Sequence, residues 1–415
     1  MMRPPAGGNE THIGMAILGI FTVKKVCWHN GQYYTYGGFG EYLAAMRTSF
    51  SRVLLIAHVR NVVPPKGHYL IPPGDDLKVI HLPWVRSELG TWLTMPFVFW
   101  RAWRASGEID VAHARMPNHT GVIGAFLCRI RGVPVFCQII ADWYIEAQRM
   151  SITRKYGLGL AMKLHLYLYD LMERAVCHGQ MVFAQGQTCF DKHQEHSDCE
   201  LVLSTAHHLN DIVLPTRRFQ QRPFTILTVA RLTGVKHQEL TLRAVGRLCS
   251  EGEDWKVVFV GEGPRREALE VLAHELGIHA RVSFAGQVER GADLWQYFDT
   301  ADCFVLSSRS EGTPKVLLEA MARGLPIIAS KVAGVPTSVT HEERGLLFKD
   351  DDLTGLVASL RRIAAEPSLR ERMVANAHEF CIEHTVEKAT NRMLDKVFST
   401  WPHLEDSKKR LTHNR

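Results

Sequence analysis

The chain has 415 residues, enough for two or three domains of about 150 residues, and 46% of them are hydrophobic while 22% are charged. This composition excludes a wholly disordered, collagenous or fibrous protein. The formal net charge of +6 is modest for this length, so it suits an anionic small ligand or an acidic membrane surface as well as nucleic acid.

The nine cysteines predict free thiols rather than disulfides or a zinc site. Their number is odd, none forms a Cys-x-x-Cys pair, and several lie inside apolar runs. The first ten residues lack the apolar core of a secretory signal, and the longest apolar stretch, 158–177, carries four charged side chains. We therefore expect a cytoplasmic protein and a globular helix, not a membrane span, at 158–177.

Predicted strands alternate with helical patterns along the first half, which favours parallel βαβ units. A glycine loop, Gly37-Gly38-Phe39-Gly40, precedes a helix expected over 41–46. The expected strands are 12–20, 52–57, 78–82, 111–114, 133–140, 181–184 and 201–203.

A polar, basic segment bracketed by Pro215 and Pro223 predicts a domain boundary. Beyond it the alternation restarts, with strands at 225–229, 256–260, 282–285, 303–306 and 326–329 and helices at 239–248, 265–276 and 314–323. We expect domains over 1–215 and 224–385, a last helix within 386–400 and a charged tail over 401–415.

The stretch 308–330 places a helix start at the carboxyl edge of a buried strand. Thr313 is the expected N-cap, Pro314 suits the first helical position, and Gly324 ends the helix. Open α/β sheets bind ligands at this edge, and the free N–H groups of a helix start favour an anion such as phosphate.

Two carboxylates flank this turn, Glu311 in the loop and Glu319 in a nearly apolar helix. Both suit sugar hydroxyls as hydrogen-bond acceptors, because like charges would repel a phosphate. The alternative is a structural role: the Glu311 carboxylate interacts favourably with the helix dipole, and Glu319 pairs with a nearby arginine.

Arg231 and Lys236 follow the first strand of the second half, where they would clamp a diphosphate or form only a solvated basic loop. The turn at Gly261 and Gly263 is a poor dinucleotide fingerprint, because Arg266 occupies the third glycine position. A nicotinamide cofactor is therefore not expected.

The ordered motifs of residues 224–385 resemble the C-terminal half of the retaining family-4 glycosyltransferases, also called glycosyl transferases group 1. The matching segments are Val-Ala-Arg-Leu with Lys236, Val-Gly-Glu-Gly-Pro264, Val-Ser-Phe-Ala-Gly286, Ser-Arg-Ser-Glu-Gly-Thr-Pro314 with Leu-Glu-Ala-Met-Ala322, Ala-Gly-Val-Pro336 and Arg-Gly-Leu-Leu-Phe348. The resemblance implies the α/β GT-B fold: two Rossmann-like domains face a cleft, and a C-terminal helix crosses back to the N-terminal domain.

The resemblance also implies a role for each matching residue. Arg231 and Lys236 would hold the donor diphosphate and stabilise its charge, and Glu311 would accept hydrogen bonds from the donor sugar, so these three are the catalytic candidates. The other implied donor contacts are Glu319 at the ribose, Gly286 and Gln287 beside the base, and the loop and amides of Gly312, Thr313, Lys315 and Val316 at the distal phosphate.

Three departures leave the base and acceptor contacts open. His237 stands where the family usually has glycine, Thr337 where an acid is common, and 206–210 lacks the usual Asn-Gly step.

The first half resembles the family weakly. Gly38 lies in a loop similar to the family's glycine loop near the donor phosphates. Asp142 and His113, each at a strand end, are acceptor-side candidates, with a helix N-cap and a packed core histidine as the respective alternatives. No general base is assigned.

Asp350-Asp-Asp352 resembles a metal-binding Asp-x-Asp but precedes a helix, so capping is expected; we expect no metal and no cofactor beyond a nucleotide-sugar co-substrate. Residues 93–104 mix large apolar residues with two arginines, which suits either a bilayer interface or an ordinary buried helix start.

Together these features predict retaining transfer of a hexosyl-type sugar from a UDP- or GDP-linked donor to a carbohydrate or lipid-linked acceptor, in surface polysaccharide or glycolipid assembly. The alternatives are a sugar-nucleotide epimerase on a similar scaffold and a non-catalytic binding protein. A nucleic-acid partner is not expected, because no basic stripe is interleaved with aromatics.

Overall fold

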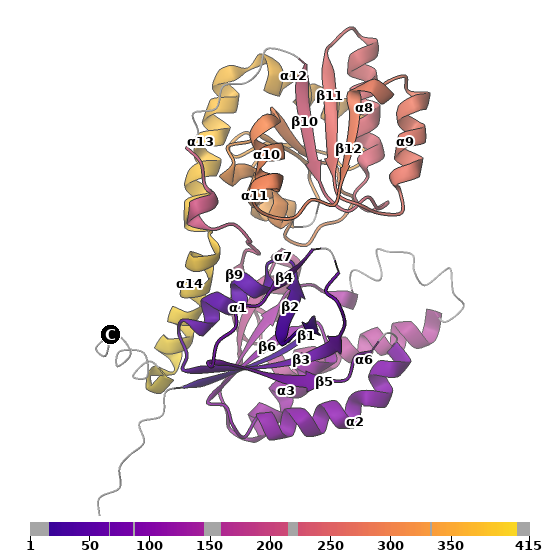
Figure 1. The fold of residues 1–415 in the computed structure, drawn as a ribbon. Coiled ribbons are helices and arrows are strands. Elements are labelled where there is room, and N and C mark those ends of the chain that lie inside the picture. The colour runs from indigo at the N-terminus through magenta and orange to yellow at the C-terminus, as the bar shows by residue number, and fades with distance from the viewer. Residues whose placement is uncertain are drawn as a thin grey trace, which may run out of the picture.

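The computed structural model describes residues 16–65, 67–85, 88–144, 159–214, 223–332 and 334–404. These form two α/β units, one above the other in Figure 1, each built on its own sheet. The expected boundary at 215–222 and the tail beyond 404 lie outside the described residues. Two Rossmann-like units with a helix crossing between them are the architecture that the resemblance implies.

The N-terminal sheet has nine strands, and all its pairings are parallel except those of a hairpin edge. Its order is β4-β2-β1-β6-β7-β8-β9, with β3 paired to β1 and β5 to β3. The strands are β1 (Ile17–His29), β2 (Gln32–Tyr36), β3 (Arg52–Asn61), β4 (His68–Leu70), β5 (Leu77–Leu82), β6 (Val111–Met116), β7 (Val135–Ile139), β8 (Met181–Gln185) and β9 (Asp198–Val202).

The first strand differs from the prediction, because it continues past Ile20 to His29 and turns back as β2. Asn30 and Gly31 make the turn with φ of 48° and 78°. An Asn-Gly pair accepts positive φ at both central positions, which is what a tight hairpin requires. The segment after the first expected strand, 12–20, therefore continues as a hairpin.

Helices cover both faces of this sheet. One face carries α1 (Phe39–Arg47) and the other α2 (Glu88–Ala105), α3 (His119–Ile130) and α6 (Gly159–Cys177), with the short α7 (Gln187–His193) before β9. The globular helix expected at 158–177 is confirmed as α6, and no described helix is both long and apolar enough to cross a bilayer.

The C-terminal sheet is entirely parallel, in the order β12-β11-β10-β13-β14-β15. Its strands are β10 (Phe224–Val229), β11 (Trp255–Val260), β12 (Val282–Gly286), β13 (Cys303–Leu306), β14 (Ile327–Ser330) and β15 (Leu346–Phe348). Its helices are α8 (Gln238–Ser250), α9 (Arg266–Glu275), α10 (Ala292–Thr300), α11 (Lys315–Ala322), α12 (Leu353–Ala365) and α13 (Pro367–Glu383). Short 3-10 turns lie at Leu209–Asp211, His279–Arg281, Val335–Thr337 and Pro402–Leu404.

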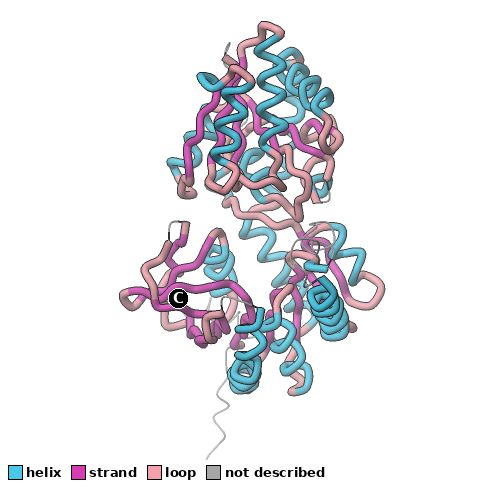
Figure 2. Tube along the Cα trace, turned by 90° about the vertical axis from the view of Figure 1, so that its right-hand side faces the viewer, coloured by secondary structure: helices cyan, strands magenta, loops and turns pink. Residues whose placement is uncertain are grey.

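The chain then returns to the N-terminal unit through α14 (Val386–Thr400), which follows α13 down one side of the molecule in Figure 1. The turned view of Figure 2 shows the same two units one above the other. Thr385 caps α14 by accepting a hydrogen bond from the Lys388 N–H. Met393, Leu394, Val397 and Phe398 enter the core beneath α1, so the two units are joined twice, before β10 and through α14.

Candidate functional site

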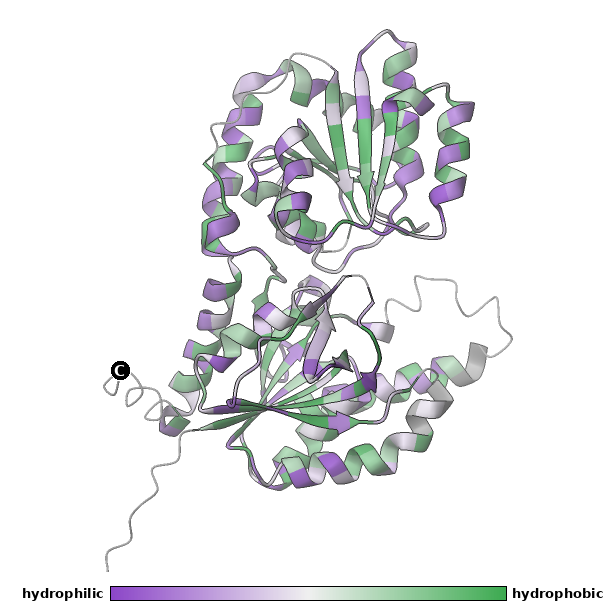
Figure 3. Cartoon of the chain, viewed as in Figure 1, coloured by the Kyte–Doolittle hydropathy of each residue, from purple (hydrophilic) through white to green (hydrophobic). Residues whose placement is uncertain are grey.

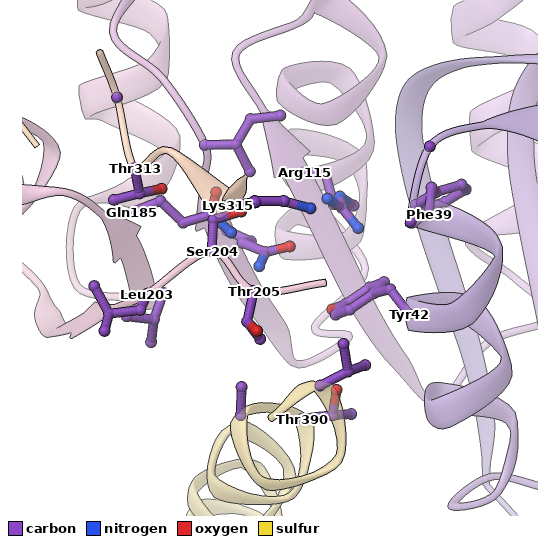
Figure 4. A pocket seen from close by; sticks show the side chains of 18 of the residues that line it. Phe39, Tyr42, Arg115, Gln185, Leu203, Ser204, Thr205, Thr313, Lys315 and Thr390 are labelled. Carbon is purple, nitrogen blue, oxygen red and sulfur yellow. The ribbon is translucent and has the colours of Figure 1, made fainter. Parts of the chain in front are cut away.

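A cavity of about 480 Å³ lies between the two units (Figure 4). The C-terminal unit contributes the start of α11, α14 contributes one side, and the N-terminal unit contributes the ends of several strands and the glycine loop. The lining residues are Lys24, Tyr36, Gly37, Gly38, Phe39, Tyr42, Arg115, Gln138, Ile140, Gln185, Val202, Leu203, Ser204, Thr205, Gly312, Thr313, Lys315, Val386, Ala389, Thr390 and Met393. Three of them are cations and none is an acid.

The start of α11 faces this cavity. The helix begins at Lys315, with Pro314 as its N-cap in an extended conformation (φ −73°, ψ 102°). Thr313 is therefore not the N-cap, because the proline continues the loop for one residue more than predicted. The N–H groups of the first turn have no acceptor within the helix, so Lys315 and Val316 offer backbone donors at this end.

Lys315 adds a charge to those donors. Its side chain extends toward Arg115 of the N-terminal unit (Figure 4). The protein that surrounds the ammonium in the cleft, together with the like charges of Arg115 and Lys24, lowers the pKa of Lys315 to about 8. Three cations held together without an acid in the lining form a site that an anion would neutralise.

Arg115 rests on aromatic rings, with its guanidinium carbon 4.9 Å from the centre of Phe39 and 4.6 Å from that of Tyr42. Its Nε and Nη1 atoms are buried and have no hydrogen-bond partner in the part of the chain that is described. A buried guanidinium with unused donors fits an anionic ligand, because leaving such donors unpaired is costly. Arg115 and Lys24 were not among the predicted site residues.

Lys236 and Glu311 form the second part of the site. The Lys236 Nζ lies 2.6 Å from Glu311 Oε1, and Ser308 Oγ donates to the same oxygen at 2.5 Å. Glu311 is therefore held by two donors, with 8% of its side chain exposed. Arg231 follows β10 on the exposed loop and forms no ion pair with a described acid.

His237, after Lys236, has a φ of 49° and ψ of 42°. This is the left-handed region that glycine accepts most easily, which explains why the family usually has glycine here. His237 is held by Arg309, whose Nη2 lies 3.0 Å from His237 Nε2. The departure therefore changes the residue but keeps the turn.

Glu319 is buried and pairs with an arginine, as the structural alternative expected. Its Oε1 lies 3.4 Å from the Nε of Arg290. The other two guanidinium nitrogens of Arg290 contact Glu41 Oε1 at 2.5 Å and Asp211 Oδ2 at 2.9 Å. Burial raises the pKa of Glu319, and Arg290 and Lys315 oppose that shift. Arg290 also donates its backbone N–H to Tyr69 Oη at 2.8 Å, so this residue of the C-terminal unit is held by α1 and β4 of the other unit.

Gly38 lines the cavity with Gly312, Thr313 and Lys315, whereas Gly286, at the end of β12, and Gln287, after it, lie outside its lining. The structure thus joins the predicted glycine loop to the start of α11. It places Arg231, Lys236, Glu311, Val316 and Glu319 around the same end of the C-terminal sheet but not in the lining of this cavity.

The acceptor-side candidates Asp142 and His113 do not line the cavity. Asp142 Oδ2 lies 3.2 Å from Lys192 Nζ, in a buried cluster with Asp170 and Glu173. His113 is fully buried, stacked on Phe136 with ring centres 4.5 Å apart, and burial holds its pKa well below the usual range. Both environments are those of packed structural residues. The structure therefore does not place Asp142 or His113 at the cavity, where an acceptor-side residue was expected.

Asp352 is the N-cap of α12 and accepts a hydrogen bond from Gly355 N–H at 2.9 Å, so the capping interpretation of this segment is confirmed. Among the described residues no group of three or more His, Cys, Asp or Glu side chains is arranged to hold a metal ion.

Solved structures with this architecture cover nearly the whole chain. Sucrose-phosphate synthase from Thermosynechococcus elongatus aligns with a TM-score of 0.69 at 18% identity, covering 93% of this chain and 99% of its own. HepE of Anabaena in complex with UDP aligns with a TM-score of 0.66 at 17% identity, covering 93% and 100%. The protein therefore has the GT-B fold of these glycosyltransferases.

Sequence comparison identifies the C-terminal unit more closely. Residues 215–380 match the family Glycosyl transferases group 1, so the chain carries a domain of this family. The lipopolysaccharide core biosynthesis glycosyltransferase LpsD of Rhizobium meliloti is 35% identical over 173 residues, 41% of this chain and 48% of LpsD. The D-inositol 3-phosphate glycosyltransferase of Saccharomonospora viridis is 31% identical over 174 residues, 40% of each. The chain thus spans about half or less of the length of these relatives.

Proposed function

We propose that this protein transfers a sugar from a nucleoside-diphosphate donor to an acceptor hydroxyl, with retention at the anomeric carbon. One observation carries the proposal: the Lys236–Glu311 pair and the first turn of α11 adjoin an acid-free, cationic cavity between two GT-B units. The Glycosyl transferases group 1 domain that contains these residues supports it.

The donor diphosphate would replace Glu311 as the partner of Lys236. Lys236 would leave Glu311 for a phosphate oxygen, and Arg231 and Lys315 would add charge there with the α11 amides. Glu311 would then accept hydrogen bonds from the donor sugar, while Glu319 would accept from the ribose. As the glycosidic C–O bond breaks, these cations stabilise the leaving diphosphate, which accepts the acceptor's proton as the new bond forms.

UDP is the preferred nucleotide in this proposal, with GDP as the competitor to test. HepE, which shares the fold, was solved with UDP and with UDP-glucose. A hexosyl-type donor and a carbohydrate or lipid-linked acceptor fit the name of LpsD as a lipopolysaccharide core glycosyltransferase. We place the reaction in the cytoplasm because all nine cysteines are free.

Catalysis without a required metal or further cofactor is part of the proposal, because protein cations already face the diphosphate position. The epimerase alternative needs no acceptor and the binding-protein alternative needs no turnover. The relatives named above are glycosyltransferases, which favours neither alternative.

Thermal shift with UDP, GDP, ADP, CMP and NAD, with and without EDTA, tests the donor site. Ligand at about 100 times its Kd should stabilise the protein by about 2.7 kcal/mol. We expect stabilisation by one nucleoside diphosphate, unchanged by EDTA and lost in Arg231→Ala. The matched control is Arg243→Ala on α8, an exposed arginine away from the cleft. A shift with NAD alone would contradict the proposal, and sugar transfer measured by mass spectrometry of the acceptor would separate it from epimerisation.

A further inference from the structure

The outer surface of one helical layer of the N-terminal unit is unusually apolar. Helices α2, α3 and α6 cover one face of the sheet, and their inner sides pack in its core (Figures 1 and 3). Their outward sides carry further large apolar residues, which we call the apolar face: Leu93, Phe97, Phe99, Trp100, Trp103, Phe126, Ile130, Leu164, Tyr167, Leu168, Leu171 and Met172.

This face differs from the rest of the surface. It holds twelve of the twenty large apolar side chains that are exposed among the described residues, and beyond residue 223 the described chain exposes only Val271. Trp100 and Trp103 are 46% and 39% exposed. A helix that is apolar on its outer side as well as its inner side is covered by another apolar phase. The buried-helix alternative for residues 93–104 thus accounts for the inner side only.

The charges on the same surface are positive. Arg104, Arg129, Arg131 and Lys163 are exposed, and none forms an ion pair with a described acid. The acids of α6, Asp170 and Glu173, are buried around Lys192, and no other described side chain of these helices is acidic. On the described parts of these three helices, the exposed charged side chains are therefore all cations.

The arginines lie over the tryptophans. The guanidinium carbon of Arg131 is 3.9 Å from the ring centre of Trp103, and that of Arg104 is 5.1 Å from Trp100. Such pairs place aromatic rings and positive charges at the same depth, which suits the boundary between acyl chains and anionic headgroups.

We propose that the apolar face docks on the surface of a bilayer that contains anionic lipid. A symmetric contact with a second copy of the chain would bring the same cations against one another, whereas anionic headgroups neutralise them. The apolar side chains would enter the region between the headgroups and the acyl chains, and the protein would not span the bilayer. This inference does not rest on the proposed transferase activity.

Vesicle flotation of the full chain tests the proposal, with phosphatidylcholine vesicles that contain or lack about 30 mol% phosphatidylglycerol. We expect binding to the anionic vesicles, at least about tenfold weaker in Trp100→Ser/Trp103→Ser, because each ring removes apolar area from water. Val271→Ser is the matched control and should bind as the wild type does. Arg104→Gln should weaken binding about fivefold on anionic vesicles only, while Arg243→Gln should not.

Failure of the wild type to float with anionic vesicles would overturn the proposal, as would unchanged flotation of the double variant. A wild-type dimer that the double variant dissociates, without vesicle binding, would assign the face to a second copy and also overturn it. Circular dichroism checks folding, and Leu168→Ser/Met172→Ser on α6 serves if the tryptophan variant does not fold. Nucleotide thermal shift should be the same in all variants, so loss of membrane binding and loss of donor binding are distinguishable.

Discussion

The two units contribute to the cleft in different ways. The C-terminal unit supplies its part from two short segments, with Lys236 after β10 and the stretch 311–319 at the start of α11. The N-terminal unit supplies single residues from many elements, among them Lys24 from β1, Arg115 from β6 and Gln138 from β7. A site built from contiguous loops leaves a motif in the sequence, whereas a site assembled from the ends of separate strands depends on the sheet order.

Replacing Lys236 should have the largest effect, because it removes the cation nearest Glu311. We expect kcat for sugar transfer to fall by roughly a hundredfold or more in Lys236→Met, as when a preorganised charge is removed from a transition state. The variant also leaves a largely buried Glu311 with only Ser308 as a partner, which should cost about 1–3 kcal/mol in urea unfolding.

A double variant separates these two effects. Lys236→Met/Glu311→Gln should regain most of the free energy of unfolding but none of the activity, since it removes the unpaired charge without restoring a cation. If activity returned with stability, the pair would be structural and the catalytic assignment would be wrong.

Arg115 tests the contribution of the other unit. Arg115→Met keeps an apolar side chain beside Phe39 and Tyr42 but removes the guanidinium, so UDP affinity should fall about tenfold. Isothermal titration calorimetry measures this, with Arg243→Met as the control. An unchanged affinity would show that the phosphates bind on the C-terminal unit alone.

Titration of Lys315 should give a smaller, pH-dependent effect. With a pKa of about 8, Lys315 is charged below that pH and neutral above it. UDP affinity should therefore be level below pH 8 and decline above it, by at most about tenfold per pH unit. The same measurement on Lys315→Gln should lose this decline, and a decline that persisted would belong to another group.

The sequence predicted five of the six strands of the C-terminal unit, all but β15, and three of its helices, α8, α9 and α11. The strand at 303–306 coincides with β13, and Lys236 and Glu311, both predicted as site residues, lie in contact with each other. Even the misplaced N-cap is a one-residue error at a proline, where local preferences for loop and helix compete. Short βα repeats keep sequence neighbours close in space, so local patterns suffice.

The N-terminal contribution and the contacts between units were harder to predict. Asn30-Gly31 is a hairpin signal that was available in the sequence, but Arg115 on β6 was not predicted as a site residue. Nothing in the sequence around Arg290 indicates Glu41, Asp211 and Glu319 as its partners, because they meet only once the two units are oriented. The interdomain network therefore could not be derived from periodicity or motifs.

His208 offers a test of that network, with the smallest expected effect. Its Nε2 lies 3.5 Å from Glu41 Oε2 on α1 and its Nδ1 lies 2.5 Å from Glu387 Oε1 on α14. The neighbouring carboxylates of Glu41 and Glu387 raise the pKa of His208 to about 9, against the cost of burial. A histidine in the unfolded chain titrates near pH 6.5. The stabilisation from His208 is thus complete below pH 6.5 and is lost as the pH rises to about 9.

Because about a third of the His208 side chain is exposed, solvent screening should limit this stabilisation to about 1 kcal/mol. Urea unfolding of the wild type and His208→Gln between these pH values measures it, and the difference between the two should shrink as the pH rises. His178→Gln, at an exposed histidine after α6, is the control. A difference that stayed constant with pH would mean that His208 contributes by packing and not by charge, and that α1 and α14 are joined by their shared core rather than by this ion network.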